Sequence, residues 1–366
     1  MKSNPIFLVA GARPNFVKLA PLVRALETAG ELPYRVIHTG QHYDNALSAS
    51  FFSMLDIPAA DINLEVGSGS HAAQTARIIE LFEHTLLKER PRAIVVFGDV
   101  NSTLACAVTA SKLLVPVVHV EAGLRSFDRR MPEEINRIVT DVLSDLLLVS
   151  DPAGLTNLEA EGIPPSKVKY VGNIMIDSLA RMLPEAVKSQ AHKQLGLKAG
   201  EYAFLTMHRP SNVDSPEVLR RLMDLFVNIS QQLPIVFPVH PRTRQRLQAL
   251  GFQEKEHAPN LLLIPPADYL ESLCLQKFAR VVLSDSGGIQ EESSYLGVPC
   301  LTMRENTERP VTVEYGSSTL VGSQPEQIQA VLDQVLSGHY KQGRPIPLWD
   351  GHTAERITKI LLDWYA

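Results

Sequence analysis

Short runs of β-branched and other apolar residues alternate with amphipathic segments of helix length, and this alternation occurs twice along the 366-residue chain. Such runs are typical of strands that are buried on both faces, and the segments between them have the apolar spacing of helices that pack on a sheet. The order predicts an α/β fold with parallel, doubly wound sheets. The expected strands are 6–10, 34–38, 93–97, 115–120 and 146–149, then 202–207, 235–239, 261–264, 281–283 and 298–302.

The two rounds of alternation predict two Rossmann-like domains, and the chain is longer than one core usually supports. A polar, Lys-rich stretch over 184–200 separates the rounds. We therefore expect the chain to pass between domains near 172–200. The expected division is residues 1–172 and 173–351, with a last helix within 352–366 that packs back on the first domain. Earlier helices are expected at 16–29, 71–89, 102–114 and 132–143.

Composition narrows the class of ligand and the compartment. Hydrophobic residues make up 45% of the chain, and its net charge of −5 is spread without a basic cluster, which favours a small ligand over nucleic acid or a membrane surface. No apolar stretch approaches the ~20 residues of a membrane span, and the first residues do not resemble a secretory signal. The three cysteines are far apart and the histidines lack metal-ligand spacing. These features predict a cytoplasmic protein without a disulfide framework or a built-in metal.

In open α/β sheets the ligand lies beyond the carboxyl ends of the strands, and the residues there are unusually polar in this chain. The first strand is followed by 11–15, in which Gly11 allows close backbone approach and Arg13 precedes a helix start. This arrangement suits a phosphate, and an ordinary strand-to-helix turn explains it equally well. It is not the GxGxxG pattern of dinucleotide-binding proteins.

Three acidic residues lie at the same predicted sheet edge. Asp99 has an alternative role as a helix cap for the helix that begins near Ser102, and taken singly that role is favoured. Glu121 directly continues a buried strand, so its carboxylate needs either an ionic or hydrogen-bonding partner or a functional role. Glu133 and Glu134 fall in the first turn of a helix, where the helix dipole already favours acids. Together, Asp99, Glu121 and Glu133 provide groups for proton removal and redelivery from different directions.

In the second half, His208 and His240 follow two strands. A lone strand-end histidine is more often structural, but both are expected at one sheet edge. Between another strand and a helix, 286–288 offers backbone N–H groups to a pyrophosphate, and Glu292 is placed to accept from both ribose hydroxyls. Arg309 and Arg304 add positive charge. The alternative for this unit is a plain packed turn.

In combination, these motifs resemble the non-hydrolysing UDP-N-acetylglucosamine 2-epimerase family over nearly the whole chain. The matching motifs are GARP (11–14), Lys18, TGQH (39–42), GD (98–99), HVEAGLR (119–125), PEE (132–134), HR (208–209), SGG (286–288) with Glu292, and TERP (307–310). The resemblance implies two Rossmann-like domains facing across a cleft, the glycosyltransferase-B arrangement. It also implies a homodimer that needs no cofactor.

The resemblance further implies the reaction and its residues. Family members invert C2 of UDP-N-acetylglucosamine to give UDP-N-acetylmannosamine, by anti elimination of UDP to 2-acetamidoglucal and re-addition. The implied catalytic residues are Asp99, Glu121 and Glu133, assisted by His208. The implied substrate or UDP contacts are Arg13, Lys18, His42, Gln74, Arg209, His240, Ser286, Gly287, Gly288, Glu292 and Arg309.

The chain departs from the family pattern in two places. Ser272 stands where members often carry an aromatic residue that stacks on uracil, and Tyr269 is the possible substitute. Tyr43, Asp44 and Ala73 do not follow the lining of the second substrate site that activates some members. The stretch 126–130 is similar to epimerases of modified sugars such as diacetamido-glucuronate. The alternatives are therefore such a 2-epimerase, a hydrolysing epimerase, a glycosyltransferase of the same fold, or a non-catalytic nucleotide-sugar sensor.

Overall fold

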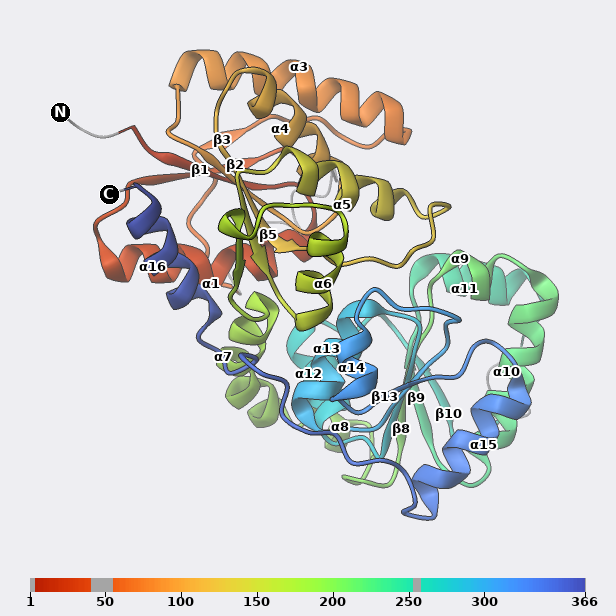
Figure 1. Ribbon diagram of the computed structural model, residues 1–366. Helices are drawn as coiled ribbons and strands as arrows, with labels where there is room; N and C mark the ends of the chain where they lie inside the picture. The colour runs from red at the N-terminus through yellow and green to blue at the C-terminus, as the bar shows by residue number, and fades with distance from the viewer. Residues whose placement is uncertain (1–3, 41–54, 253–257, 366) are drawn as a thin grey trace. The chain divides into compact units, whose positions relative to one another are not determined.

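The computed structural model (Figure 1) describes residues 4–40, 55–252 and 258–365; the side chain of Arg13 is outside the description. By their internal packing the residues divide into two compact units. The first unit is Met1–Ser178 together with Pro347–Ala366, and the second is Leu179–Ile346. Each unit is built around one parallel sheet with helices between successive strands, as the alternation in the sequence requires.

The first unit contains a seven-stranded parallel sheet in the order β3-β2-β1-β4-β5-β6-β7. The interior strand β1 is buried along its whole length, in agreement with its continuous apolar sequence. The order reverses at β1, where β2 and β4 pair on opposite sides. The strands are β1 (Ile6–Ala10), β2 (Tyr34–His38), β3 (Ile62–Asn63), β4 (Ile94–Phe97), β5 (Val117–Ala122), β6 (Leu146–Val149) and β7 (Val168–Tyr170).

The second unit contains a six-stranded parallel sheet in the order β10-β9-β8-β11-β12-β13. Its core is formed by apolar side chains from the central strands and from the helices that cover them. The strands are β8 (Ala203–Thr206), β9 (Ile235–Pro238), β10 (Leu261–Ile264), β11 (Val281–Ser284), β12 (Cys300–Thr302) and β13 (Ser318–Leu320).

Helices cover both faces of the first sheet. In Figure 1, α1 (Arg13–Ala29) and α16 (Thr353–Tyr365) lie side by side on one face, and α3 (His71–Glu89) and α4 (Asn101–Lys112) lie on the other. The remaining helices of this unit are α5 (Pro132–Leu143), α6 (Pro152–Ala160) and the short helix η1 (Pro165–Lys167). Those of the second unit are α8 (Ala191–Gln194), α9 (Pro210–Val213), α10 (Pro216–Ser230), α11 (Pro241–Ala249), α12 (Tyr269–Lys277), α13 (Gly287–Leu296), α14 (Pro310–Glu314) and α15 (Pro325–Leu336).

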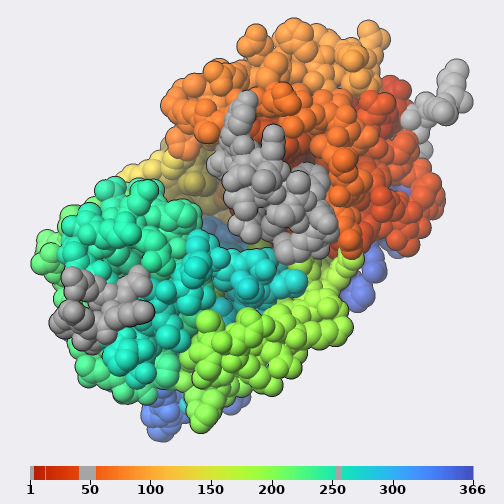
Figure 2. Space-filling model, turned by 180° about the vertical axis from the view of Figure 1, so that it is seen from behind, coloured from red at the N-terminus to blue at the C-terminus, as the bar shows by residue number. Residues whose placement is uncertain are grey.

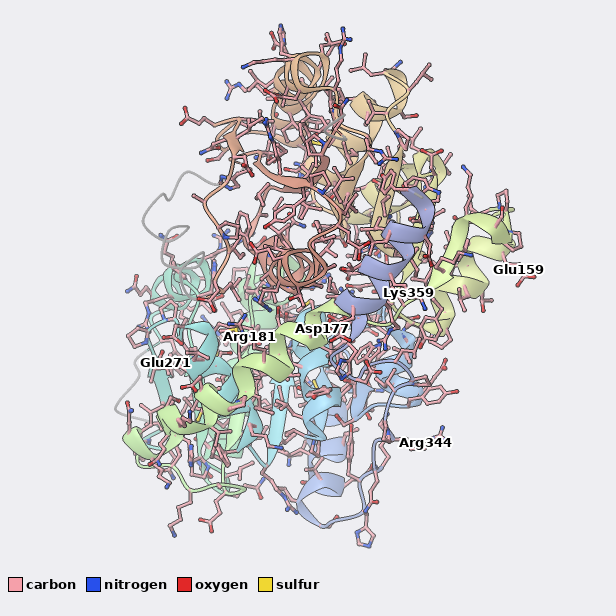
Figure 3. All side chains as sticks on the ribbon, turned by 90° about the vertical axis from the view of Figure 1, so that its left-hand side faces the viewer. Glu159, Asp177, Arg181, Glu271, Arg344 and Lys359 are labelled. Atoms are coloured by element: carbon pink, nitrogen blue, oxygen red, sulfur yellow. The ribbon has the colours of Figure 1, made fainter. Side chains whose placement is uncertain are left out.

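One helix runs through the division between the units: α7 (Ile174–Ser189) begins in the first unit and ends in the second. It is visible as the light-green ridge in Figure 2. Asp177 on α7, which is labelled in Figure 3, accepts hydrogen bonds from the backbone N–H groups of Thr353 (3.1 Å) and Ala354 (2.7 Å), and so caps the start of α16. This contact fastens the last helix to the first unit.

The predicted fold class, α/β with two Rossmann-like units, is confirmed by the two parallel sheets. All ten predicted strands are present, with ends that differ by at most two residues. Three short strands, β3, β7 and β13, were not predicted. They hold two or three residues each, which is too few to produce a periodic pattern in the sequence, and all three form sheet edges. Within the described residues, no helix is both long and apolar enough to span a membrane.

Candidate active site

Two of the predicted catalytic acids follow neighbouring strands of the first sheet. Asp99 comes two residues after β4, and Glu121 lies near the end of β5, which pairs with β4. The pairing of β5 with β6 shifts register between Val120 and Ala122, so Glu121 forms a bulge. Its φ of 75° is in the left-handed region, which is unusual for a residue with a side chain and is often found at functional sites.

Glu121 forms an ion pair with the Lys18 ammonium group on α1, and both side chains are almost fully buried. The pair lies beside Gly98, whose φ is 62°. A Cβ atom on Gly98 would come within 2.7 Å of the Lys18 Nζ and 3.4 Å of a Glu121 carboxylate oxygen. A side chain at this position would therefore have to displace the ion pair, and the positive φ of Gly98 also favours glycine. Lys18 is therefore the partner that a carboxylate at the end of a buried strand requires.

Asp99 is held by Arg137 on α5, whose Nε donates to its carboxylate at 3.0 Å and whose Nη2 lies 2.9 Å away. Asn136 donates to the Asp99 backbone carbonyl at 2.8 Å. The helix-cap interpretation of Asp99 is wrong, because α4 begins after Val100 and no side chain caps it. The Asp99 carboxylate is about one-quarter exposed (28%), so it is anchored and still accessible.

The two glutamates at the start of α5 have different surroundings. Glu134 is buried, pairs with Arg137, and accepts the backbone N–H groups of Ser126 (3.0 Å) and Phe127 (2.8 Å). It therefore fixes the loop before the helix. Glu133 is half-buried beside it. Of the pair, Glu133 is the one with a side chain still open to solvent.

A chain of amides extends the polar edge of the first unit. Asn101 donates to Gln74 on α3 at 2.8 Å, and Gln74 donates to the carbonyl of Gly67 at 3.1 Å. The side-chain oxygen Oδ1 of Asn101 also accepts a hydrogen bond from Asn136 at 3.4 Å and lies 3.2 Å from Nδ1 of His71. Gln74 is thus connected, through Asn101 and Asn136, to the backbone of Asp99.

The backbone N–H groups at the start of the first strand-to-helix turn are hydrogen-bonded within the turn. Asn15 accepts the backbone N–H groups of Gly11 (3.2 Å) and Ala12 (3.1 Å), and its amide donates to the carbonyl of Phe97 at 2.8 Å. Arg13 is the first residue of α1. The prediction for His42 lies outside the described residues, as does the side chain of Arg13.

In the second unit, His208 and Arg209 follow β8 and are anchored by the buried Asp285. Asp285 accepts the backbone N–H of His208 (3.1 Å) and of Arg209 (2.9 Å), and Nδ1 of His208 lies 3.2 Å from it. The His208 side chain remains half-exposed. The His240 ring lies 6.3 Å from that of His208, and burial, the neighbouring His208 and Arg242 lower the pKa of His240. The two predicted histidines are therefore neighbours.

The predicted Gly-Gly turn is the first turn of α13, with Ser286 at its N-cap, and Gly287 and Gly288 in the helix. This places helix N–H groups beside a cation: a Cβ on Gly287 would lie 2.9 Å from Nη1 of Arg309. Arg309 is itself paired with Glu291 (2.6 Å) and Glu308 (2.7 Å). Ser286, Gly287, Gly288 and Arg309 thus form one polar patch.

Glu292 is buried one turn into α13 and accepts a hydrogen bond from Gln276 on α12 at 2.7 Å. Burial raises the pKa of Glu292 to about 7, although the hydrogen bond from Gln276 lowers it. Burial and the neighbouring Glu292 also raise the pKa of Tyr269 well above its ordinary value. The Tyr269 hydroxyl is therefore packed against Glu292, while Ser272 lies one turn further along α12.

Sequence reasoning assigned no role to Arg137, Asn101, Asp285 or Gln276. The sequence pattern could have indicated two of them: Arg137 lies on the helix face of Glu133 and Glu134, and Asp285 directly follows a buried strand. No sequence pattern indicates Gln276 or Asn101. Across the described ranges, no group of three or more His, Cys, Asp or Glu side chains is arranged to hold a metal ion.

Comparison with known proteins points to one family. The sequence model of the UDP-N-acetylglucosamine 2-epimerase family matches residues 24–362. A UDP-N-acetylglucosamine 2-epimerase from Methanocaldococcus jannaschii is 41% identical over 97% of this chain and 98% of its own length. A UDP-2,3-diacetamido-2,3-dideoxy-D-glucuronate 2-epimerase from Pseudomonas aeruginosa is 39% identical over 88% of this chain and 90% of its own.

The similarity extends to three dimensions. The crystal structure of the Methanocaldococcus jannaschii enzyme in complex with UDP-GlcNAc and UDP superposes with a TM-score of 0.88. The alignment covers 98% of this chain and 99% of that one at 40% identity.

Proposed function

Because this chain belongs to the UDP-N-acetylglucosamine 2-epimerase family, we propose that it inverts C2 of UDP-N-acetylglucosamine to give UDP-N-acetylmannosamine. The family assignment makes the protein a nucleotide-sugar epimerase, an isomerase. The proposal adds the sugar on which it acts and the groups that carry out the reaction.

The observation that carries the proposal is the placement of Asp99 and Glu121 at adjoining strand ends, each anchored by a buried cation. The hydrogen on C2 is not adjacent to a carbonyl carbon, so a base alone faces a very high barrier. Anti elimination breaks the C2–H and C1–O bonds and gives 2-acetamidoglucal and UDP. Re-addition of UDP with proton delivery to the opposite face of C2 gives the epimer, and this requires two proton-transfer groups.

The first unit supplies the proton transfers in this proposal. Asp99 and Glu121 remove and return the C2 proton, and Glu133 positions or tunes them. Lys18 orients the carboxylate of Glu121 and supplies the ionic partner that a buried carboxylate requires. Arg137 orients the carboxylate of Asp99. Gln74 contributes to substrate binding. Hydrogen bonds through Asn101 and Asn136 connect it to the Asp99 backbone.

The second unit supplies UDP binding in this proposal. The first turn of α13, Arg309, and the pair His208 and Arg209 stabilise the charge that develops on the departing UDP, which is usually the largest electrostatic contribution to such catalysis. Glu292 accepts from the ribose hydroxyls with the carboxylate that Gln276 orients. His240 lies close enough to His208 to act with it, and Arg13 and His42 complete the substrate contacts.

We also propose a cytoplasmic location and a homodimer. The location is proposed from cysteine usage, because Cys106, Cys274 and Cys300 are buried and widely spaced in the sequence, a pattern typical of proteins from reducing compartments. A size-exclusion measurement with light scattering tests the dimer, and a mass near 40.4 kDa would contradict it.

A second sugar is supported by one observation, the 39% identity to a diacetamido-glucuronate 2-epimerase. The two sugars differ at C3 and C6, while the C2 chemistry is the same. The test supplies UDP-N-acetylglucosamine and UDP-2,3-diacetamido-glucuronate separately and follows the products by proton NMR. Faster turnover of the first supports the proposal, and turnover of the second alone would replace it. Release of UDP with free N-acetylmannosamine would identify a hydrolysing enzyme instead.

A further inference from the structure

His119 on β5 is fully buried between two groups that accept hydrogen bonds. Its Nδ1 lies 2.6 Å from Oδ1 of Asp141 on α5, and its Nε2 lies 2.8 Å from the backbone carbonyl oxygen of Gly98. Gly98 immediately precedes Asp99, and His119 lies two residues before Glu121 on the same strand. A single buried ring therefore links the backbone segments that carry both acids.

The second oxygen of Asp141 contacts the chain beyond the β5 bulge. Gly123 donates its backbone N–H to Oδ2 at 3.0 Å, and Nη1 of Arg125 lies 2.8 Å from the same oxygen. Arg125 is held in turn by Glu161 through two hydrogen bonds of 2.7 Å. The pair of His119 and Asp141 thus contacts the backbone on both sides of the bulge.

Hydrogen-bond chemistry defines the protons of this pair. A carbonyl oxygen only accepts, so Nε2 of His119 donates to Gly98. The two donors at Oδ2 of Asp141, from Gly123 and Arg125, favour its carboxylate form, so Nδ1 of His119 donates as well. Burial alone would raise the pKa of Asp141, but His119 and Arg125 hold the pKa of that carboxyl below its ordinary value. Each ring nitrogen of His119 therefore has an acceptor within hydrogen-bond distance, Oδ1 of Asp141 and the Gly98 carbonyl oxygen.

We propose that His119 and Asp141 are positioning residues for the epimerisation, which hold the Gly98 carbonyl and the Gly123 N–H so that Asp99 and Glu121 keep the geometry of proton transfer. The inference rests on the proposed function. Glu121 needs this support because its left-handed backbone conformation persists only when the surrounding structure enforces it. Proton transfer at C2 needs it because small displacements of a reacting group lower the rate steeply.

Stability is a weaker explanation for the pair. Burying two charged groups carries a desolvation cost that offsets their attraction, and apolar replacements of similar size are often neutral. If the pair positions the two acids, its removal should lower kcat strongly and lower the free energy of unfolding only slightly. The two explanations therefore differ in a measurable quantity.

The test compares His119→Phe with Asp141→Asn. Phenylalanine removes both donors and releases the Gly98 carbonyl, so kcat should fall about 10-fold or more, while KM and the UDP dissociation constant stay within about 3-fold. Asparagine donates to a neutral His119 through its Nδ2 and accepts from Gly123 through its Oδ1. Both backbone anchors survive, and Asp141→Asn should keep kcat within about 3-fold of the wild type.

Asp177→Asn is the matched control, because Asp177 is a buried acid of the same unit that accepts from backbone N–H groups and contacts neither Gly98 nor Gly123. It should lower the melting temperature without lowering kcat. Full turnover in His119→Phe, or losses in Asp141→Asn as large as those in His119→Phe, would overturn the proposal.

A measurement on the wild-type protein remains decisive even if His119→Phe does not fold. In protein with ¹⁵N-labelled histidine, NMR should show a proton on Nε2 of His119, the nitrogen that faces the Gly98 carbonyl oxygen. An unprotonated Nε2 would contradict the anchor. If the wild type leaves UDP-N-acetylglucosamine and its diacetamido analogue unchanged, the proposed function fails, and this spectrum still tests the anchor independently.

Discussion

The ammonium group of Lys18 and the carboxylate of Glu121 form a buried ion pair directly beside the Cα of Gly98. The three groups come from α1, from the bulge of β5 and from the end of β4. A predicted proton-transfer group is thereby held in place by contacts from two other elements. Arg137 holds Asp99 in a corresponding way.

Lys18→Met removes the cation and leaves a buried carboxylate unpaired. Breaking a buried pair in this way costs about 3–5 kcal/mol, so the free energy of unfolding of the first unit should fall by that amount. Urea denaturation measures it. The double variant Lys18→Met/Glu121→Gln should recover part of the loss, because the unpaired charge is gone. Equal stability of the single and double variants would mean that the pair is not coupled.

Gly98→Ala introduces a Cβ that meets the Lys18 ammonium group. The substitution should lower turnover at least 10-fold, because the ion pair must move and displaces Glu121. Gly162→Ala is the control: its φ of 76° imposes the same backbone strain, and no neighbouring atom lies within 4 Å of the added Cβ. Both variants should lose about 1–2 kcal/mol of stability. Normal turnover in Gly98→Ala would show that the ion pair is not needed for the reaction.

Asp99→Asn keeps the size of the side chain and removes its capacity to transfer a proton. Turnover should fall about 100-fold or more, while UDP binding, measured by calorimetry, persists. Asp350→Asn, which removes the carboxylate of another aspartate–arginine pair in the same unit, should leave turnover unchanged. Near-normal activity in Asp99→Asn would remove Asp99 from the mechanism.

The affinity for UDP should depend on pH through Glu292, whose pKa is raised to about 7 by burial. A ribose hydroxyl donates to the ionised carboxylate, so binding should strengthen as pH rises from about 6 to 8 and weaken below. Calorimetry of the wild type and of Glu292→Gln across this range separates the titration of Glu292 from that of UDP itself. The same pH slope in both proteins would exclude the carboxylate from UDP binding.

Much of the fold could be predicted from the sequence because parallel strands that are buried on both faces leave uninterrupted apolar runs, as in 6–10 and 34–38. The bulge at Glu121 could not be predicted, since it depends on how β5 pairs with β6. The edge strands β3 and β13 are held mainly by their neighbours. Register and short pairings are tertiary properties, and no local pattern encodes them.

For the site, the sequence indicated which residues follow the strands, since strand ends can be read from the pattern. It did not indicate which side chains meet. The partner of Glu121 is 103 positions away at Lys18, and that of Asp99 is 38 positions away at Arg137. Gln276 lies inside a helix with no unusual spacing, and only the packing of α12 against α13 brings it to Glu292. Contacts of this kind require the fold.

The most direct measurement is proton NMR of the purified protein incubated with UDP-N-acetylglucosamine in D₂O. Proton removal and redelivery at C2 predict that deuterium replaces hydrogen at C2 as UDP-N-acetylmannosamine forms with its pyrophosphate intact, and that neither change occurs in Asp99→Asn on the same timescale. Conversion to the epimer with the original hydrogen retained at C2, or an unchanged substrate, would contradict the account.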